Sequence, residues 1–124
     1  GRALVEQLKQ LCPEQPLLAV GTNALATAAM LRAGADQGAT GENAVVVNAA
    51  HADLIVGPIG IVLCDALLGE VTDRMACAIG RSPAHNILSP VARCQVTVVG
   101  CERLSASEAV NQAAREAAKW IKGA

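Results

Sequence analysis

The sequence has neither phenylalanine nor tyrosine and only one tryptophan, which argues against one class of function from the outset. Proteins that bind single-stranded nucleic acid stack bases on aromatic rings, and proteins that bind duplexes present a basic surface to the phosphates. This chain has 10 Lys and Arg against 11 Asp and Glu, a formal net charge of -1. Because it has no excess of basic residues and almost no aromatic rings, we expect no nucleic-acid partner.

Metal-binding and secretion patterns are also missing. The five cysteines form no C-x-x-C pair, and the only two histidines, His51 and His85, lie outside any zinc-ligand spacing, so we expect no metal. An odd number of cysteines without paired spacing is typical of reduced thiols, and no basic segment followed by an apolar one opens the chain. Polar residues interrupt the longest apolar region, 44–69, too often for a membrane span. The sequence therefore favours a cytoplasmic protein without a membrane partner.

Small aliphatic residues are what the chain has in abundance. Hydrophobic residues make up 52% of its 124 residues, mostly Ala, Val, Leu and Ile. That length suits one domain with a hydrophobic core of its own, so we expect a single domain over residues 1–124. Small side chains allow helices to pack closely on a sheet.

Strand-like and helix-like patterns alternate along the chain. Continuous apolar runs predict strands at 16–21, 44–48, 54–56, 86–91 and 94–100. Helical patterns lie between them, at 1–12, 24–34, 59–68, 74–80 and 105–123. The loop between the helix at 24–34 and the strand at 44–48 is rich in glycine and could act as a lid. Asp65 interrupts the apolar helix at 59–68, and we expect it on an exposed edge.

The order of these elements predicts the fold class. Apolar strands separated by helices are typical of an α/β domain with a single doubly wound, mostly parallel sheet and helices on both faces, as in Rossmann-like proteins. The opening helix has no residue before it that could cap its first N–H groups. A right-handed crossover needs a strand on each side of that helix, so we expect a first strand that the 124 residues do not include.

Two motifs resemble a known family. GTNALATAAM at residues 21–30 and VGPIGIV at residues 56–62 resemble a family of small bacterial proteins described only as a domain of unknown function. The resemblance extends to about Gly100. It implies that a short strand and a Gly-rich turn precede the opening helix, with Gly1 as the last glycine of that turn. It implies no activity that could be transferred.

Glycine-bearing turns after the strands form the candidate ligand site. A Gly-rich turn between a strand and a helix can hold a pyrophosphate on backbone N–H groups. Dinucleotide sites also carry an acid after the second strand, where this chain has Gly21, Thr22 and Asn23 and no carboxylate. The candidate cofactor-binding residues are Gly1, Gly21, Thr22, Asn23, Gly57, Pro58 and Gly60. The same residue types also suit helix caps and tight turns without any ligand.

Two functions from different classes are consistent with these patterns. The first is a small-molecule binding protein that takes a nucleotide, a dinucleotide or another phosphorylated ligand at the carboxyl ends of the strands. The alternative is a homo-oligomeric assembly or regulatory module without catalysis, because Ala-rich helix faces also favour self-association. No nucleophile and base pattern occurs, so catalytic residues stay unknown and whether the protein is an enzyme stays open.

Overall fold

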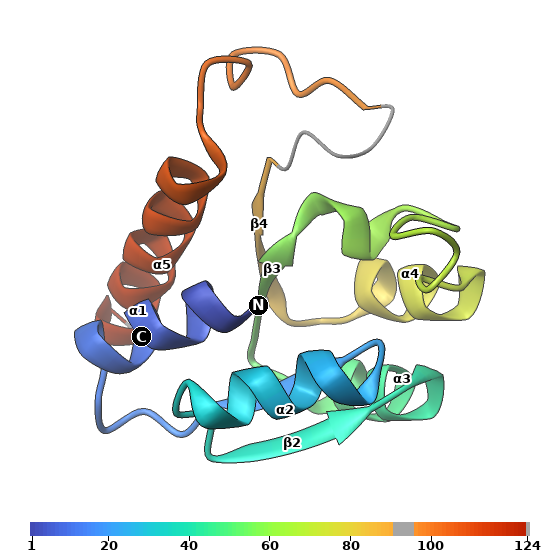
Figure 1. Ribbon diagram of the computed structural model, residues 1–124, viewed down its shortest axis with the longest axis horizontal. Helices are drawn as coiled ribbons and strands as arrows, with labels where there is room; N and C mark the ends of the chain where they lie inside the picture. Colours follow the sequence, from blue (N-terminus) through green and yellow to red (C-terminus); the bar gives the residue numbers. More distant parts are fainter. Residues whose placement is uncertain (91–95, 124) are drawn as a thin grey trace.

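Short parallel strands alternate with helices along the chain. The computed structural model describes residues 1–90 and 96–123, and Figure 1 shows the arrangement of their elements. In chain order these are α1 (Arg2–Leu11), β1 (Leu18–Gly21), α2 (Ala24–Arg32), β2 (Gln37–Thr40), α3 (Glu42–His51), β3 (Leu54–Pro58), the 3-10 helix η1 (Ile59–Val62), α4 (Asp73–Arg81), β4 (His85–Ser89) and α5 (Ala106–Gly123). No helix among these residues is both long and apolar enough to cross a lipid bilayer.

The strands form two parallel pairs. β1 pairs with β2 from Leu18 opposite Gln37 to Gly21 opposite Thr40. β3 pairs with β4 from Leu54 opposite His85 to Pro58 opposite Ser89. The α/β class with parallel strands is therefore confirmed. The single doubly wound sheet stays a prediction, since the described strands form two two-stranded sheets.

Side-chain caps mark the start of three of the helices that the sequence predicted. The Asn23 side chain accepts a hydrogen bond from the Ala26 N–H and caps α2, while Thr72 caps α4 through the Met75 N–H. Ser105 accepts a hydrogen bond from the Glu108 N–H before α5. Each of these helices begins within about two residues of its predicted start.

The prediction for residues 37–48 was wrong. The structure has a strand at Gln37–Thr40 and a helix at Glu42–His51, where we expected a glycine-rich lid loop followed by a strand. Gly41 makes the change of direction possible with a φ of 98°. Val45 then packs from α3 onto the buried cluster of Val71 and Met75. Tertiary packing therefore overrides the β-branched composition of this segment.

Two further predictions differ from the structure. The apolar run after β3 forms only the 3-10 helix η1 and then a series of turns, in which Asp65, Leu67 and Leu68 have positive φ angles of 64°, 57° and 56°. Asp65 is exposed there, but on a turn and not on a helix edge. The strand expected at 94–100 is absent from residues 96–100, and residues 91–95 lie outside the described part of the chain.

Helix α1 packs on both strand pairs. Its Val5 belongs to the buried cluster around Ala19 of β1. Its Leu8 belongs to a second cluster with Ala114 and Ala117 of α5, onto which Leu54, Val56 and Ile87 of the β3–β4 sheet pack. Ala114 and Ala117 are completely buried, which lets α5 approach α1 closely. One helix thus covers parts of both sheets.

Candidate functional site

Two of the predicted site residues meet a carboxylate from a distant segment. Thr22 and Asn23 follow β1, and Glu70 lies on the turns after η1. The Thr22 hydroxyl donates a hydrogen bond to Glu70 Oε2 at 3.3 Å, and Asn23 Nδ2 donates to Glu70 Oε1 at 2.9 Å. The structure therefore supplies an acid at the end of β1 that the local sequence lacks.

The end of β2 meets the same distant segment. Glu42, at the start of α3, accepts a hydrogen bond from the Thr72 hydroxyl at 2.6 Å. Its second oxygen accepts one from Arg74, 3.2 Å away. The carboxyl ends of β1 and β2 therefore both lie against residues 70–74. We call the group of Thr22, Asn23, Glu42, Glu70 and Thr72 the carboxyl-end rim.

Gly21 has a packing role beneath this rim. A Cβ atom at Gly21 would lie 2.8 Å from the Thr27 backbone nitrogen and still closer to the Thr27 hydroxyl. Buried Thr27 bonds the Thr40 hydroxyl at 2.8 Å and so links α2 to the end of β2. Gly21 thus allows α2 to approach β1, as the purely structural interpretation of its turn requires.

The glycines in the turn after β3 have more space around them than Gly21 has. A Cβ atom at Gly57 would meet the flexible end of Ile61 at 3.0 Å, and one at Gly60 would meet Ala66 at an ordinary 3.7 Å. Pro58 ends β3 and is the N-cap of η1 without a side-chain cap. Residues 57–60 lead directly into the turns that carry Glu70, but no polar contact joins them to Thr22 or Asn23 among the described residues.

Gly1 lies apart from the rim contacts. It is the N-cap of α1, and a Cβ atom there would come within 2.6 Å of Met30 Sδ on α2. Met30 lies two helical turns beyond the Asn23 cap. The structure therefore brings Thr22 and Asn23 together with Glu70 and leaves Gly1 on the side of α2.

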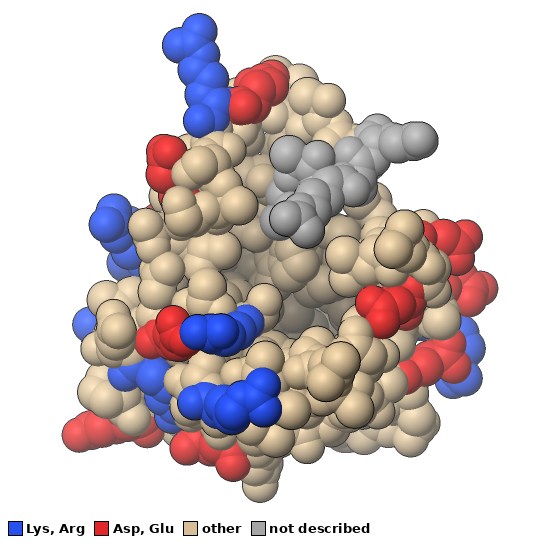
Figure 2. All heavy atoms as spheres, in the orientation of Figure 1, with Lys and Arg blue, Asp and Glu red and all other residues tan. Residues whose placement is uncertain are grey.

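Acidic groups dominate the rim. Glu42 is paired with Arg74, whereas Glu70 forms no ion pair within the described residues. Figure 2 shows acidic side chains gathered over the part of the molecule where Figure 1 places α3 and α4. An exposed carboxylate without a cation can accept hydrogen bonds from hydroxyl groups of a ligand, as the Thr22 hydroxyl already shows. It would repel a phosphate group placed at the same point.

The remaining chemical groups lie elsewhere. His51 ends α3 and is exposed, while His85 stacks on Trp120 with ring centroids 5.9 Å apart. Cys12, Cys64, Cys77 and Cys101 are free thiols. Within residues 1–90 and 96–123, no three His, Cys, Asp or Glu side chains gather closely enough to hold a metal ion.

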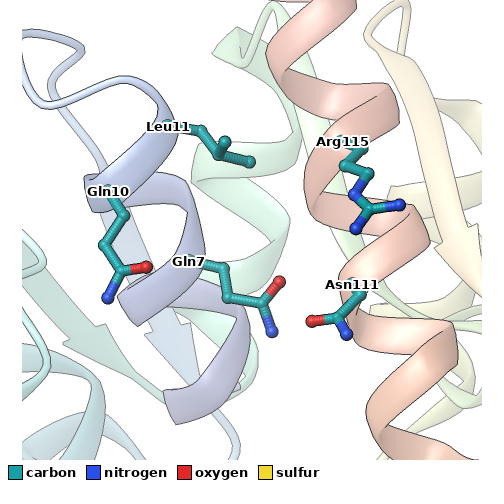
Figure 3. Close-up of a pocket in the computed structure, with 5 residues that line it drawn as sticks. All are labelled: Gln7, Gln10, Leu11, Asn111 and Arg115. Carbon is teal, nitrogen blue, oxygen red and sulfur yellow. The ribbon is translucent and has the colours of Figure 1, made fainter.

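A second polar hollow lies between α1 and α5. Figure 3 shows Gln7 and Leu11 of α1 pointing toward α5, which carries Asn111 and Arg115, while Gln10 lies on the other side of α1 in this view. The cleft has a volume of about 350 Å³ and is lined by these five residues alone. None of them was among the predicted site residues, and the described lining of the cleft holds no carboxylate or imidazole beside Arg115. The cleft provides a second place where a small polar ligand could be tested.

Sequence reasoning missed Glu70 and Glu42. Glu70 lies 48 residues from Thr22, and Glu42 lies 30 residues from Thr72. No periodicity or motif spacing relates positions so far apart. The one local signal was that Glu70 directly precedes the α4 capping segment that begins with Val71 and Thr72.

The fold and the rim define an α/β protein with parallel strands and a polar site at their carboxyl ends. A family model described as domain of unknown function (DUF3842) matches residues 1–122, and the chain belongs to this family. Neither the curated proteins nor the solved structures contain a match to the chain.

Proposed function

We propose that the chain binds a nucleotide or a related sugar-containing ligand at the carboxyl-end rim, with hydroxyl groups of the sugar held by Glu70. The observation that carries this proposal is the position of the Glu70 carboxylate, fixed by Thr22 and Asn23 after β1. In open parallel sheets, ligands bind outside the carboxyl ends of the strands, and an acid after the second strand takes the ribose hydroxyls of a dinucleotide.

The chemistry of the three side chains suits a pair of neighbouring hydroxyl groups. A carboxylate has two oxygens and accepts one hydrogen bond from each hydroxyl, while Thr22 and Asn23 can donate to or accept from the same groups. Glu70 is exposed, so its oxygens are accessible to a ligand as well as to the two residues that orient it.

Phosphate groups of such a ligand belong away from Glu70. The predicted glycine turn at Gly57 to Gly60 has no acidic side chain of its own. Backbone N–H groups there can approach an anion closely because glycine has no Cβ atom. The proposal is for binding in a Rossmann-like, cytoplasmic protein, and it assigns no reaction.

A thermal-shift and calorimetric panel tests the proposal. We expect adenosine, AMP and NAD to raise the melting temperature, whereas NADP, whose 2′-phosphate would face Glu70, should bind at least about tenfold more weakly than NAD. Glu70→Gln keeps the shape but removes the charge, so it should weaken NAD binding and reduce the discrimination against NADP.

Glu116→Gln is the matched control. Glu116 is exposed on α5 and, within the described residues, pairs with Lys119 alone, so its substitution should change neither affinity. If no member of the panel raises the melting temperature, the proposed function is wrong. If ligands bind but Glu70→Gln and Glu116→Gln have the same affinities for NAD and NADP, the binding site lies elsewhere.

Self-association is the second candidate function, and one observation favours it. Leu68 is fully exposed and Leu67 is 46% exposed on adjacent turns near the rim. Apolar side chains presented together in this way are typical of an interface. Native mass spectrometry should then show a stable oligomer that Leu68→Ser converts to monomers, whereas a monomer at all concentrations would exclude this candidate.

A further inference from the structure

The cleft between α1 and α5 holds amide side chains that have no partner in the described part of the chain. Gln7 and Asn111 are both partly buried, and neither amide forms a hydrogen bond within residues 1–90 and 96–123. The other partly buried amides of these residues, Gln15, Asn48 and Asn86, each donate to a backbone carbonyl. Because polar groups withdrawn from water are normally paired, the two amides of the cleft are available to a ligand.

The cleft also carries one positive charge without a counter-ion. Arg115 is exposed on α5 and forms no ion pair with any other described residue. It lies one helical turn beyond Asn111, so the guanidinium and the amide lie on the same side of α5. Figure 3 shows both beside the gap into which Gln7 points. A cation and two amides therefore line one cleft.

Close packing beneath the cleft fixes its width. Leu8, next to Gln7, belongs to a buried cluster with Ala114 and Ala117, which have no exposed surface. Alanine side chains let the backbones of α1 and α5 approach closely and leave no gap between them. Leu11, one turn after Gln7, adds an apolar side chain to the lining. The two helices that carry the polar groups are therefore held in place before a ligand arrives.

The charge and the volume of the cleft select a class of ligand. A guanidinium pairs with a carboxylate through two parallel hydrogen bonds. The cleft lies beside the last turn of α1, where unpaired carbonyls carry partial negative charge, and Lys9 of that turn is paired with Asp36. A second negative charge on the ligand is therefore disfavoured. The volume of about 350 Å³ suits about a dozen non-hydrogen atoms, fewer than a nucleotide has.

We propose that the cleft between α1 and α5 is a second binding site, which takes a small monocarboxylate that also carries an amide group. The Arg115 guanidinium donates two hydrogen bonds to the carboxylate. Gln7 and Asn111 supply both N–H donors and carbonyl acceptors, which match a group that donates and accepts at once, as a primary amide does. The site shares no residue with the carboxyl-end rim, so it stands whether or not a nucleotide binds there.

A series of half-amides of dicarboxylic acids tests the site. Malonamate, succinamate and glutaramate each carry a carboxylate at one end and a primary amide at the other. NMR titration of residues 1–124 follows the side-chain signals of Gln7, Asn111 and Arg115. We expect these signals to shift together and to saturate with at least one of the three compounds, while the amide signals of Thr22 and Asn23 stay unchanged. The corresponding diamides, which have the same shape without the charge, should bind at least about tenfold more weakly.

A matched pair of arginine variants separates the cleft from the overall charge of the protein. Arg115→Gln should weaken binding of the best half-amide by at least about tenfold. Arg81→Gln makes the same chemical change at an exposed position in the last turn of α4, which packs on α3 and η1, and should leave the affinity unchanged.

An amide variant distinguishes binding from a structural role. Asn111→Leu removes an amide without a partner in the described chain, so it should weaken binding without lowering the free energy of unfolding measured with urea. A loss of stability in this variant would show that the amide supports the fold instead.

Three further outcomes overturn the proposal. One is an absence of saturation with all three half-amides at concentrations up to about 20 mM. Another is equal affinity for half-amides and diamides, or for the two arginine variants, since Arg115 would then hold no carboxylate. The third is tighter binding of inorganic phosphate than of any half-amide, which would make the cleft an unselective anion site.

Discussion

The segments that follow β1 and β3 share a sequence pattern but fold differently. Each follows an apolar strand that ends in a glycine-bearing turn, and each continues as an apolar run. After β1 the run is the α-helix α2, whereas after β3 it is the short η1 and turns with three residues at positive φ. Asn23 caps α2 through its side chain, while Pro58 offers η1 no side-chain acceptor. Apolar composition alone therefore does not make a helix, and the side-chain cap is one difference between these two segments, although α3 begins at Gly41 without such a cap.

The largest expected effect comes from comparing alanine substitutions in the two glycine-bearing turns, by their free energies of unfolding. Gly21→Ala should lower the free energy of unfolding by about 2–3 kcal/mol, because the new methyl group would overlap Thr27. Gly60→Ala should change it by less than about 0.5 kcal/mol, since the nearest atom would be 3.7 Å away. Urea denaturation measures both, and equal losses would contradict the close packing of α2 on β1.

Val71 provides the next largest effect. It is 2% exposed and anchors the turns after η1 on Met75 and Ala76. Val71→Ala should cost about 2 kcal/mol in the free energy of unfolding. Val99→Ala is the control, because Val99 is 88% exposed and should give no loss. A negligible effect at Val71 would mean that these turns are not fixed by that side chain.

Removing the side-chain cap of α2 should lower the free energy of unfolding by a smaller amount. Asn23→Ala removes the acceptor for the Ala26 N–H and should cost about 1 kcal/mol. Asn43→Ala, in the first turn of α3 with no side-chain hydrogen bond among the described residues, serves as its control. Circular dichroism during urea unfolding gives both values. Similar values for the two variants would remove the explanation offered for the contrast between α2 and η1.

Glycine substitutions should have opposite signs in the two segments. Leu68 has a φ of 56° and is fully exposed, so Leu68→Gly should raise the free energy of unfolding by about 0.5 kcal/mol. Leu25 is 82% exposed within α2, and Leu25→Gly should lower it by about 1 kcal/mol. A loss in both variants would show that the turns after η1 do not hold left-handed residues in solution.

The smallest expected effect is a loss of stability at acid pH. It involves the ion pair between Lys9 of α1 and Asp36, which directly precedes β2. The Lys9 ammonium donates to Asp36 at 2.6 Å and lowers the pKa of that carboxyl below 3.8, with help from the Leu17 N–H. The contribution of Asp36 to stability is complete above pH 3.8 and is lost as the pH falls through its folded-state pKa. Asp36→Asn should flatten that part of the stability curve measured by urea unfolding, and an unchanged slope would argue against the pair.

Local signals explain the parts of the fold that the sequence predicted. The strand at Leu18–Gly21, its turn and α2 carry their start and stop residues within a few positions, from Asn23 to Gly34, whose φ is 119°. Residues 37–48 carry local signals that predict the wrong structure. Three consecutive valines favour a strand, yet β2 forms instead at Gln37–Thr40 because that segment pairs in register with β1. Pairing between distant segments is invisible to local patterns.

The candidate site was predictable only in part, for the same reason. Thr22 and Asn23 were identifiable because polar residues directly after a buried strand are typical of both caps and ligand sites. Glu70 was not, since only the folded chain brings it to Asn23 across 47 residues. The missing acid of the local motif is thus supplied from another segment.

Chemical-shift mapping by NMR during titration with NAD tests the rim against the cleft of Figure 3. If Glu70 and its two neighbours hold the ligand, the amide signals of Thr22, Asn23 and Glu70 should shift together and saturate at one dissociation constant. Shifts confined to Gln7, Gln10 and Arg115, or no shifts at all, would contradict a binding site at the carboxyl ends of the strands.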